Sequence, residues 1–296
     1  MEKITYTSLN TYLKNTYGEK LYKLSLDIGL SCPNRDGTLG TEGCAFCSAG
    51  GSGDFAVKCN PDNIHEMIDR AKEKVASKSK SNHYIAYFQA YSNTYGPIEY
   101  LRQIFFATAN RSDIAIISIA TRCDCIDDDV LELLVELNKI KPVWLEMGMQ
   151  TSYNNTLEQM NCGYTFEAFC DTTERLSNAG IEVIAHLIIG LPGESEEMIL
   201  TSVSRACALP IKGIKLSMLH VLKNTKLAQI YEKQHFHVYT LEEYCILIAR
   251  CLEIIPKDIV VHRITGDGPK NILIEPRWSD DKKKVLNTLS KYITPS

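Results

Sequence analysis

The chain has 296 residues, 45% of them hydrophobic and 23% charged, which is the composition of a folded globular protein rather than of a disordered one. Lysine and arginine number 32 against 36 aspartate and glutamate, so the net charge of −4 gives no general attraction to nucleic acid. No apolar run reaches the roughly 18 residues that a membrane span needs, and the first residues hold no apolar signal segment. We therefore expect a cytoplasmic protein with no membrane partner.

Six apolar runs predict β-strands, and most neighbouring pairs are separated by a segment with helical periodicity. The runs cover residues 23–30, 84–90, 114–121, 143–149, 182–189 and 214–219. Strands that alternate with helices indicate βα units and a parallel sheet. Six units are too few to close an eightfold barrel, so we predict an α/β fold with a partial (β/α)6 TIM-like barrel; a doubly wound sheet is the alternative. The barrel would occupy residues 23–256, between short extensions at 1–22 and 257–296.

One face of these strands repeatedly carries polar side chains, although strands of a parallel sheet that is buried on both sides are usually apolar. The polar positions are Ser25, Asp27, Gln89, Glu146, Gln150, His186, Lys215 and Ser217. An internal hydrogen-bonded network is one explanation. We favour a polar barrel lumen that holds a charged ligand near the carboxyl ends of the strands, because barrel sites lie there.

Eleven cysteines in a chain expected to lie in a reducing compartment indicate metal binding or redox chemistry rather than disulfides. Cys32, Cys44 and Cys47 lie in one loop directly after the first predicted strand, with spacing C-x11-C-x2-C. A zinc site would need a fourth ligand such as Cys59 or His65. A thioredoxin-like redox pair would not need Cys32. An iron–sulfur cluster normally has four thiolates, so three would leave one iron open to an exchangeable ligand.

The loop Cys32-Pro33-Asn34-Arg35-Asp36-Gly37, with the glycine-rich stretch 50–55 after it, resembles the radical S-adenosylmethionine (SAM) superfamily. The usual loop of that superfamily is C-x3-C-x2-C, and the longer one here resembles the YhcC/YtqA-like group. This group is similar to the catalytic subunit of Elongator without its acetyltransferase domain. Further matching stretches follow in the same order, at residues 88–95, 145–151, 186–194 and 262–267, so the resemblance covers nearly the whole chain.

The resemblance implies a [4Fe–4S] cluster on Cys32, Cys44 and Cys47, with SAM bound to the open iron. A reductase, flavodoxin or ferredoxin would supply the electron that cleaves SAM and releases a 5′-deoxyadenosyl radical. The residues expected to contact SAM are Gln89, Ser92, Asn93, Arg122, Glu146, Gln150, His186 and Gly190. Ordinary turns at strand ends are the alternative for Gln89 to Asn93 and for Gly190, and a structural ion pair with Lys215 is the alternative for Glu146.

Two features depart from the family pattern. Relatives have Asn-Arg-Gly-His after the fourth predicted strand, whereas this chain has Asn161-Cys162-Gly163-Tyr164, which removes one expected polar contact. Cys123 and Cys125 form a Cys-Asp-Cys pair at the end of the third strand. A second metal site and a pair of buried thiols are the two interpretations of that pair.

Relatives of the group are associated with modification of the tRNA wobble uridine. The resemblance therefore implies radical chemistry on the C5 side chain of such a uridine, for example on a carboxymethylaminomethyl group. The basic tail, with Trp278 and the lysines 282–284, would meet phosphates and bases of the tRNA. The alternatives are a small-molecule substrate for the same class of enzyme, and a zinc-stabilised binding protein without catalysis.

Overall fold

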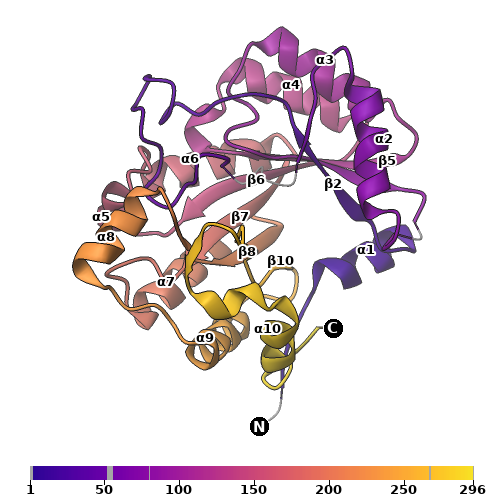
Figure 1. Ribbon diagram of the computed structural model, residues 1–296. Coiled ribbons are helices and arrows are strands. Elements are labelled where there is room, and N and C mark those ends of the chain that lie inside the picture. The colour runs from indigo at the N-terminus through magenta and orange to yellow at the C-terminus, as the bar shows by residue number, and fades with distance from the viewer. Residues whose placement is uncertain (1–2, 52–55, 80, 267, 296) are drawn as a thin grey trace.

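The computed structural model describes residues 3–51, 56–79, 81–266 and 268–295. Within these residues one sheet of eight parallel strands forms the centre, in the order β10-β8-β7-β6-β5-β4-β2-β3 (Figure 1). Its strands are β2 (Tyr22–Asp27), β3 (Val57–Lys58), β4 (Tyr84–Phe88), β5 (Ile114–Thr121), β6 (Val143–Gln150), β7 (Glu182–Ile189), β8 (Gly213–Met218) and β10 (Val260–Arg263).

All six predicted runs form strands of this sheet, and the runs 114–121 and 182–189 have the predicted bounds. From β2 to β10 the strands follow one another across the sheet in chain order, without the reversal that a doubly wound sheet requires. The two edges, β3 and β10, do not pair with each other, so the sheet does not close. The partial barrel is confirmed, and the doubly wound alternative is wrong.

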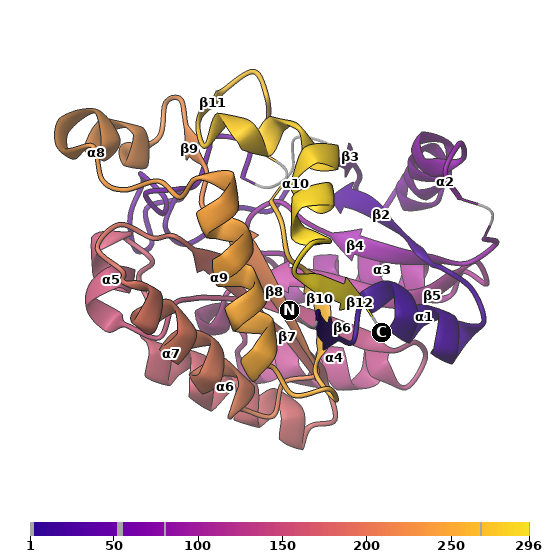
Figure 2. The same cartoon turned by 90° about the horizontal axis from the view of Figure 1, so that it is seen from below.

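Helices cover the outer face of the sheet (Figure 2). They include α2 (Ile64–Val75), α3 (Ile98–Ala109), α4 (Asp128–Asn138), α6 (Phe166–Asn178), α7 (Glu196–Cys207) and α9 (Leu241–Ile254). In α4 the Asp127 side chain accepts a hydrogen bond from the backbone N–H of Val130. The acidic side chains of the first turn interact favourably with the positive end of the helix dipole. The buried side chains of α4 recur with helical spacing, at Val130, Leu133, Leu134 and Leu137.

Helix α1 (Leu9–Tyr17) closes the end of the barrel at which the strands begin. Its Leu13 packs in an apolar cluster whose other buried members are Leu21, Ile85, Ile116, Trp144 and Ile184. The helix starts at the side-chain cap of Ser8 and ends at Gly18, which takes the left-handed conformation with φ 74°. Above this apolar layer the inward positions of the strands are polar, and we call the opposite end, where the strands finish, the barrel mouth.

The segment after α9 returns to the barrel. Strand β10 pairs with β8, β11 (Leu273–Glu275) pairs antiparallel with β9 (Val221–Leu222), and β12 (Ile293–Pro295) pairs with β1 (Ile4–Tyr6). The described residues after α9 therefore add an edge strand, β10, to the main sheet, and the expected domain boundaries stay a prediction. Among the described residues no helix is both long and apolar enough to cross a bilayer.

Truncating the Leu13 side chain tests whether α1 packs against the start of the barrel as described. Leu13 is 2% exposed, so Leu13→Ala is expected to lower the free energy of unfolding by about 2–5 kcal/mol through lost burial and a residual cavity. Leu286→Ala is the matched control, because Leu286 is 44% exposed and the expected change is within about 0.5 kcal/mol. Urea unfolding measures both. Equal losses in the two variants would mean that α1 does not pack as described.

Candidate functional site at the barrel mouth

The cysteine loop leaves the end of β2 and folds back on itself. The backbone N–H of Arg35 donates to the carbonyl of Cys32 at 2.8 Å, and the N–H of Cys47 donates to the carbonyl of Cys44 at 2.9 Å, which makes the Cys44–Cys47 segment a tight turn. The Arg35 guanidinium then donates to the carbonyls of Cys47 and Ser48 at 3.0 and 2.8 Å. One cation thus holds both ends of the loop, and its charge lies beside the thiols.

A second segment, residues 160–163, locks the loop in place. The N–H of Ala45 donates to the carbonyl of Met160 at 2.8 Å, and the Asn161 side chain donates to the carbonyl of Gly43 at 2.8 Å. The side-chain amide of Asn34 donates to the carbonyls of Asn161 and Cys162 at 2.6 and 3.1 Å, and it lies 3.6 Å from Cys44 Sγ. We call this set of contacts the Asn34 clamp.

The surroundings of the three thiols differ. A hydrogen bond with the side chain of Cys162 lowers the pKa of Cys44 to about 7. Burial of Cys44 acts in the opposite direction, whereas Arg122 and Asn34 also lower its pKa. Burial raises the pKa of Cys47, although Arg35 opposes it. Arg122 Nη1 lies 3.8 Å from Cys32 Sγ. Cys162 replaces the arginine of the family pattern, so the side chain at this position now contacts a cysteine of the loop directly.

Arg122 and Tyr164 form the wall next to the loop. Arg122 is 7% exposed, its guanidinium is held by both carboxylate oxygens of Asp124 at 2.8 and 2.6 Å, and it lies 5.0 Å from the centre of the Tyr164 ring. Burial acts against its charge, but the Asp124 carboxylate raises the pKa of Arg122 above its usual value. Arg122 is therefore a fixed cation beside Cys32. Tyr164, in place of the family histidine, supplies the surface on which it stacks.

The ends of β4 and β6 supply unsatisfied acceptors at the mouth. The Asn93 side chain donates to the carbonyls of Ala90 and Ala120 at 3.1 and 2.9 Å, while its Oδ1 is buried with no hydrogen-bond partner among the described residues. The Gln150 amide lies 3.4 Å from the Tyr164 hydroxyl, and its Oε1 is likewise without a partner in the part of the chain that the structure describes. Gln89 and Ser92 are buried beside them, at 9% and 0% exposure.

Glu146 lies deeper, in the middle of the lumen. It forms ion pairs with Lys215 and Lys23 and accepts a hydrogen bond from Ser118 at 2.8 Å. Burial opposes its charge, but the two ammonium groups hold the pKa of Glu146 well below its usual range. The ion pair with Lys215 that was the alternative at this position is present. Nearby, the ring Nε2 of His186 and the hydroxyl of Ser217 are 2.7 Å apart.

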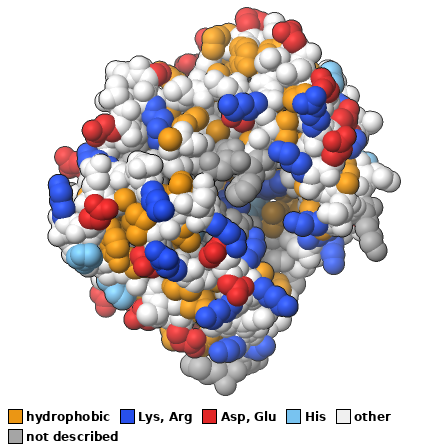
Figure 3. All heavy atoms as spheres, viewed as in Figure 1, with side chains coloured by type: hydrophobic (Ala, Val, Ile, Leu, Met, Phe, Trp, Pro, Cys, Tyr) orange, Lys and Arg blue, Asp and Glu red, His pale blue; other side chains and the backbone are white. Residues whose placement is uncertain are grey.

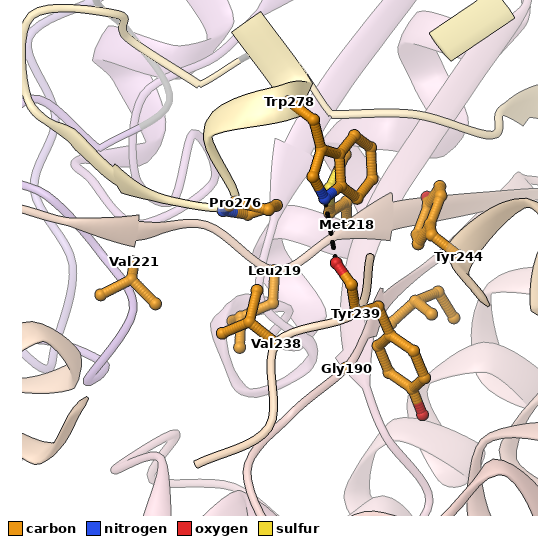
Figure 4. A pocket seen from close by; sticks show the side chains of 10 residues that line it. Gly190, Met218, Leu219, Val221, Val238, Tyr239, Tyr244, Pro276 and Trp278 are labelled. Carbon is orange, nitrogen blue, oxygen red and sulfur yellow. Dashed lines mark hydrogen bonds between the residues drawn. The ribbon is translucent and has the colours of Figure 1, made fainter. Parts of the chain in front are cut away.

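Gly190 directly follows β7 and lines a small apolar pocket under the C-terminal segment (Figure 4). Trp278 lines this pocket, its indole N–H donates to the carbonyl of Tyr239 at 3.0 Å, and its ring lies 5.5 Å from that of Tyr244. The indole is partly exposed and packs against the barrel, and the expectation that Trp278 meets tRNA bases stays a prediction. Gly190 has φ 95°, and an added Cβ would lie 3.2 Å from the Tyr239 ring, so a residue with a side chain would be strained there.

The other cysteines do not join the loop. Cys123 and Cys125 lie in a short 3-10 helix (Cys123–Cys125), where burial raises the pKa of each thiol to about 12. The thiol of Cys59 donates a hydrogen bond to the carbonyl oxygen of Asp27, with 3.5 Å between sulfur and oxygen. In the described ranges no three His, Cys, Asp or Glu side chains converge as they do around a single metal ion. Residues 52–55 of the glycine-rich stretch, and Asp267 of the last motif, lie outside the described residues.

The mouth fits the groups that the sequence resemblance implies. Three cysteines lie among the cations Arg35 and Arg122, which favours thiolates, and a low-pKa thiol such as Cys44 is a ready metal ligand. The orphaned oxygens of Asn93 and Gln150 fit a ligand that brings N–H or O–H donors. Sequence reasoning did not assign roles to Asn34, Arg35, Lys23 and Tyr87. Asn34 and Arg35 were signalled by their position two and three residues after Cys32, and Lys23 and Tyr87 by the period-two alternation of β2 and β4.

Gly163 provides a direct test of the Asn34 clamp. Its φ is 77°, and an added Cβ would lie 2.8 Å from Asn34 Oδ1, whose amide is fixed by the clamp. Gly163→Ala should therefore lower the free energy of unfolding by about 1–2 kcal/mol, because alanine is strained in the left-handed conformation. A disturbed hydrogen bond of the clamp should lower it by about 1 kcal/mol more. Gly180→Ala is the control, since φ is 78° there and nothing lies within 4 Å. Denaturant unfolding compares them, and equal losses would contradict the clamp.

Two family models match the chain. Residues 35–206 match the radical SAM superfamily and residues 211–294 match the radical SAM C-terminal domain. The protein YtqA of Bacillus subtilis is 42% identical over 288 residues, which cover 97% of this chain and 89% of that protein. The protein YhcC of Escherichia coli K12 is 33% identical over 282 residues, covering 95% and 90%.

More distant similarity reaches longer proteins. The tRNA uridine(34) acetyltransferase of Methanocaldococcus jannaschii is 27% identical over 172 residues, 57% of this chain and 31% of that protein. The solved structure of Methanocaldococcus infernus Elp3 superposes with a TM-score of 0.67 at 18% identity, covering 92% of this chain and 63% of that one, which supports the fold. The family models and the two bacterial relatives show that the chain belongs to the radical SAM superfamily.

Proposed function

We propose that this radical SAM enzyme modifies the C5 side chain of the wobble uridine in tRNA, for example a carboxymethylaminomethyl group. The cofactors of the superfamily are a [4Fe–4S] cluster and SAM. When bound, they supply a 5′-deoxyadenosyl radical after one-electron reduction. The tRNA part of the proposal is supported by the names of two relatives, a tRNA uridine(34) acetyltransferase and Elongator complex protein 3 of Schizosaccharomyces pombe, which are 27% identical over 172 and 168 residues.

In this proposal Cys32, Cys44 and Cys47 hold the cluster at the barrel mouth. Three thiolates leave one iron for SAM, whereas a structural zinc site would need a fourth ligand. The Asn34 clamp fixes Cys44, and Arg35 fixes the turn that ends at Cys47. Arg122 offsets the negative charge near Cys32, since its Nη1 lies 3.8 Å from that sulfur.

The observation that carries the SAM site is a pair of buried acceptors, Asn93 Oδ1 and Gln150 Oε1, which have no hydrogen-bond partner among the residues that the structure describes. SAM brings an ammonium group and two ribose hydroxyls, which are the donors that such oxygens lack. Gln89 and Ser92 lie in the segment after β4 that also holds Asn93, and Gly190 directly follows β7. Glu146 and His186 lie deeper and already have protein partners, so we assign them to the floor of the site rather than to its first contacts.

The tRNA would approach the mouth over the C-terminal segment. Lysines 282–284 are exposed at the start of α10 (Lys282–Leu289), and Figure 3 shows Lys and Arg side chains over this helix on the face of Figure 1. Basic side chains give sequence-independent attraction to phosphates. A flavodoxin, ferredoxin or other reductase supplies the electron, and cytoplasmic location stays a prediction. A small-molecule substrate is the competing proposal.

Charge reversal on α10 tests the tRNA proposal. Wild-type protein is expected to bind tRNA at low salt, and Lys283→Glu with Lys284→Glu should make the slope of log K against log salt shallower by about two, as two phosphate contacts are lost. Lys139→Glu with Lys141→Glu, at the opposite end of the barrel, should leave the slope unchanged. Filter binding at several salt concentrations measures this. Absence of binding to tRNA at low salt would overturn the tRNA substrate and favour a small molecule.

A further inference from the structure

Gln150 is held in a backbone conformation that residues with side chains rarely adopt. It ends β6 with φ 62°, in the left-handed region, and the register between β6 and β7 shifts between Gly148 and Gln150. Such a conformation costs free energy in any residue other than glycine, and it persists where the surrounding structure fixes it. The irregular end of the strand therefore fixes the direction in which the Gln150 side chain leaves the backbone.

Gly148 leaves the space in which the Gln150 amide lies. A Cβ added at Gly148 would lie 2.3 Å from Gln150 Nε2 and 3.3 Å from the hydroxyl oxygen of Tyr164. The amide nitrogen and the phenol therefore occupy the volume that a side chain at position 148 would need. They meet there at 3.4 Å, with the amide as the donor. The segment from Gly148 to Gln150 thus places the amide against Tyr164.

The contact with Tyr164 leaves one end of the amide for a ligand. The nitrogen faces the hydroxyl, while Oε1 is buried and has no hydrogen-bond partner within the described ranges of the chain. A side-chain amide has one donor end and one acceptor end, so a partner that takes the donor leaves the acceptor available. Burial raises the pKa of the Tyr164 hydroxyl well above its usual value, so this partner stays uncharged.

Tyr164 also belongs to the wall beside the cysteine loop. The centre of its ring lies 5.0 Å from the Arg122 guanidinium, and Arg122 Nη1 lies 3.8 Å from Cys32 Sγ. Its backbone follows shortly after Asn161 and Cys162, whose carbonyls accept from the Asn34 clamp. One side chain is thus joined to the cysteine loop on one side and to the Gln150 amide on the other.

We propose that Tyr164 is a positioning residue for SAM: its hydroxyl holds the Gln150 amide so that Oε1 is left to accept from SAM, while its ring stays against Arg122. This inference rests on the SAM site of the proposed function and is independent of the tRNA part. It also gives a role to one of the two departures from the family pattern. A hydrogen bond that orients a ligand contact in advance reduces the ordering that binding must supply, so its loss weakens binding.

The test measures the affinity of the reconstituted, oxidised protein for SAM by anaerobic equilibrium dialysis, with no reductant present. Tyr164→Phe keeps the ring against Arg122 and removes the hydroxyl. It should weaken SAM binding about three- to tenfold, as expected for one lost hydrogen bond. Gln150→Ala should weaken binding at least as much. The double variant should bind no more weakly than Gln150→Ala alone, because the hydroxyl acts through Gln150.

Two controls separate positioning from damage to the fold. Tyr12→Phe, on α1 at the closed end of the barrel, is the matched loss of a hydroxyl and should bind SAM like wild type. The EPR spectrum of the dithionite-reduced cluster is the second. Without SAM, and also when rapidly frozen with saturating SAM, Tyr164→Phe should give the wild-type spectrum, because only the affinity for SAM changes.

Three results would overturn the inference while leaving the SAM site standing. They are wild-type affinity in Tyr164→Phe, additive losses in the double variant, and an altered cluster spectrum of Tyr164→Phe without SAM. Wild-type affinity in Gln150→Ala would instead overturn the assignment of Gln150 to the SAM site, and the inference with it.

Discussion

The side-chain amide of Asn34 is the contact on which the geometry of the mouth depends. It joins the cysteine loop to the carbonyls of Asn161 and Cys162, and it approaches Cys44 Sγ at 3.6 Å. A loop with eleven residues between its first two cysteines has many conformations, and ordering them costs backbone entropy. The Asn34 clamp, which includes the bond from Ala45 to Met160, selects one of them by anchoring the loop to the segment after β6. Preorganised ligands of this kind are what a cluster site needs.

The barrel separates its lumen into layers of different polarity. Apolar side chains around Leu13 seal the end at which strands begin, the Glu146 layer lies above them, and the mouth carries the thiols and the unsatisfied acceptors. The apolar layer keeps water away from a reactive intermediate. The fixed charges above it hold polar groups of the substrate.

Much of this architecture could be predicted from local sequence patterns. The runs that became β5 and β7 had the bounds that the structure shows, and the alternation along β6 placed Glu146 and Gln150 on the inner face. The cysteine spacing located the loop. Local patterns could not reveal that Lys23 reaches Glu146, because that pair spans 123 positions and depends on the curvature of the sheet. The contact between Cys162 and Cys44, and the packing of Trp278, depend on tertiary structure in the same way.

The central claim is that three thiolates at the mouth hold a cluster with an iron open to SAM. The most direct measurement is anaerobic reconstitution with iron and sulfide, followed by dithionite and SAM, with 5′-deoxyadenosine as the product. The account predicts that wild-type protein takes up a four-iron cluster and forms the nucleoside, and that Cys44→Ala does not. Purified protein that contains zinc, fails to assemble a cluster and forms no nucleoside would contradict it.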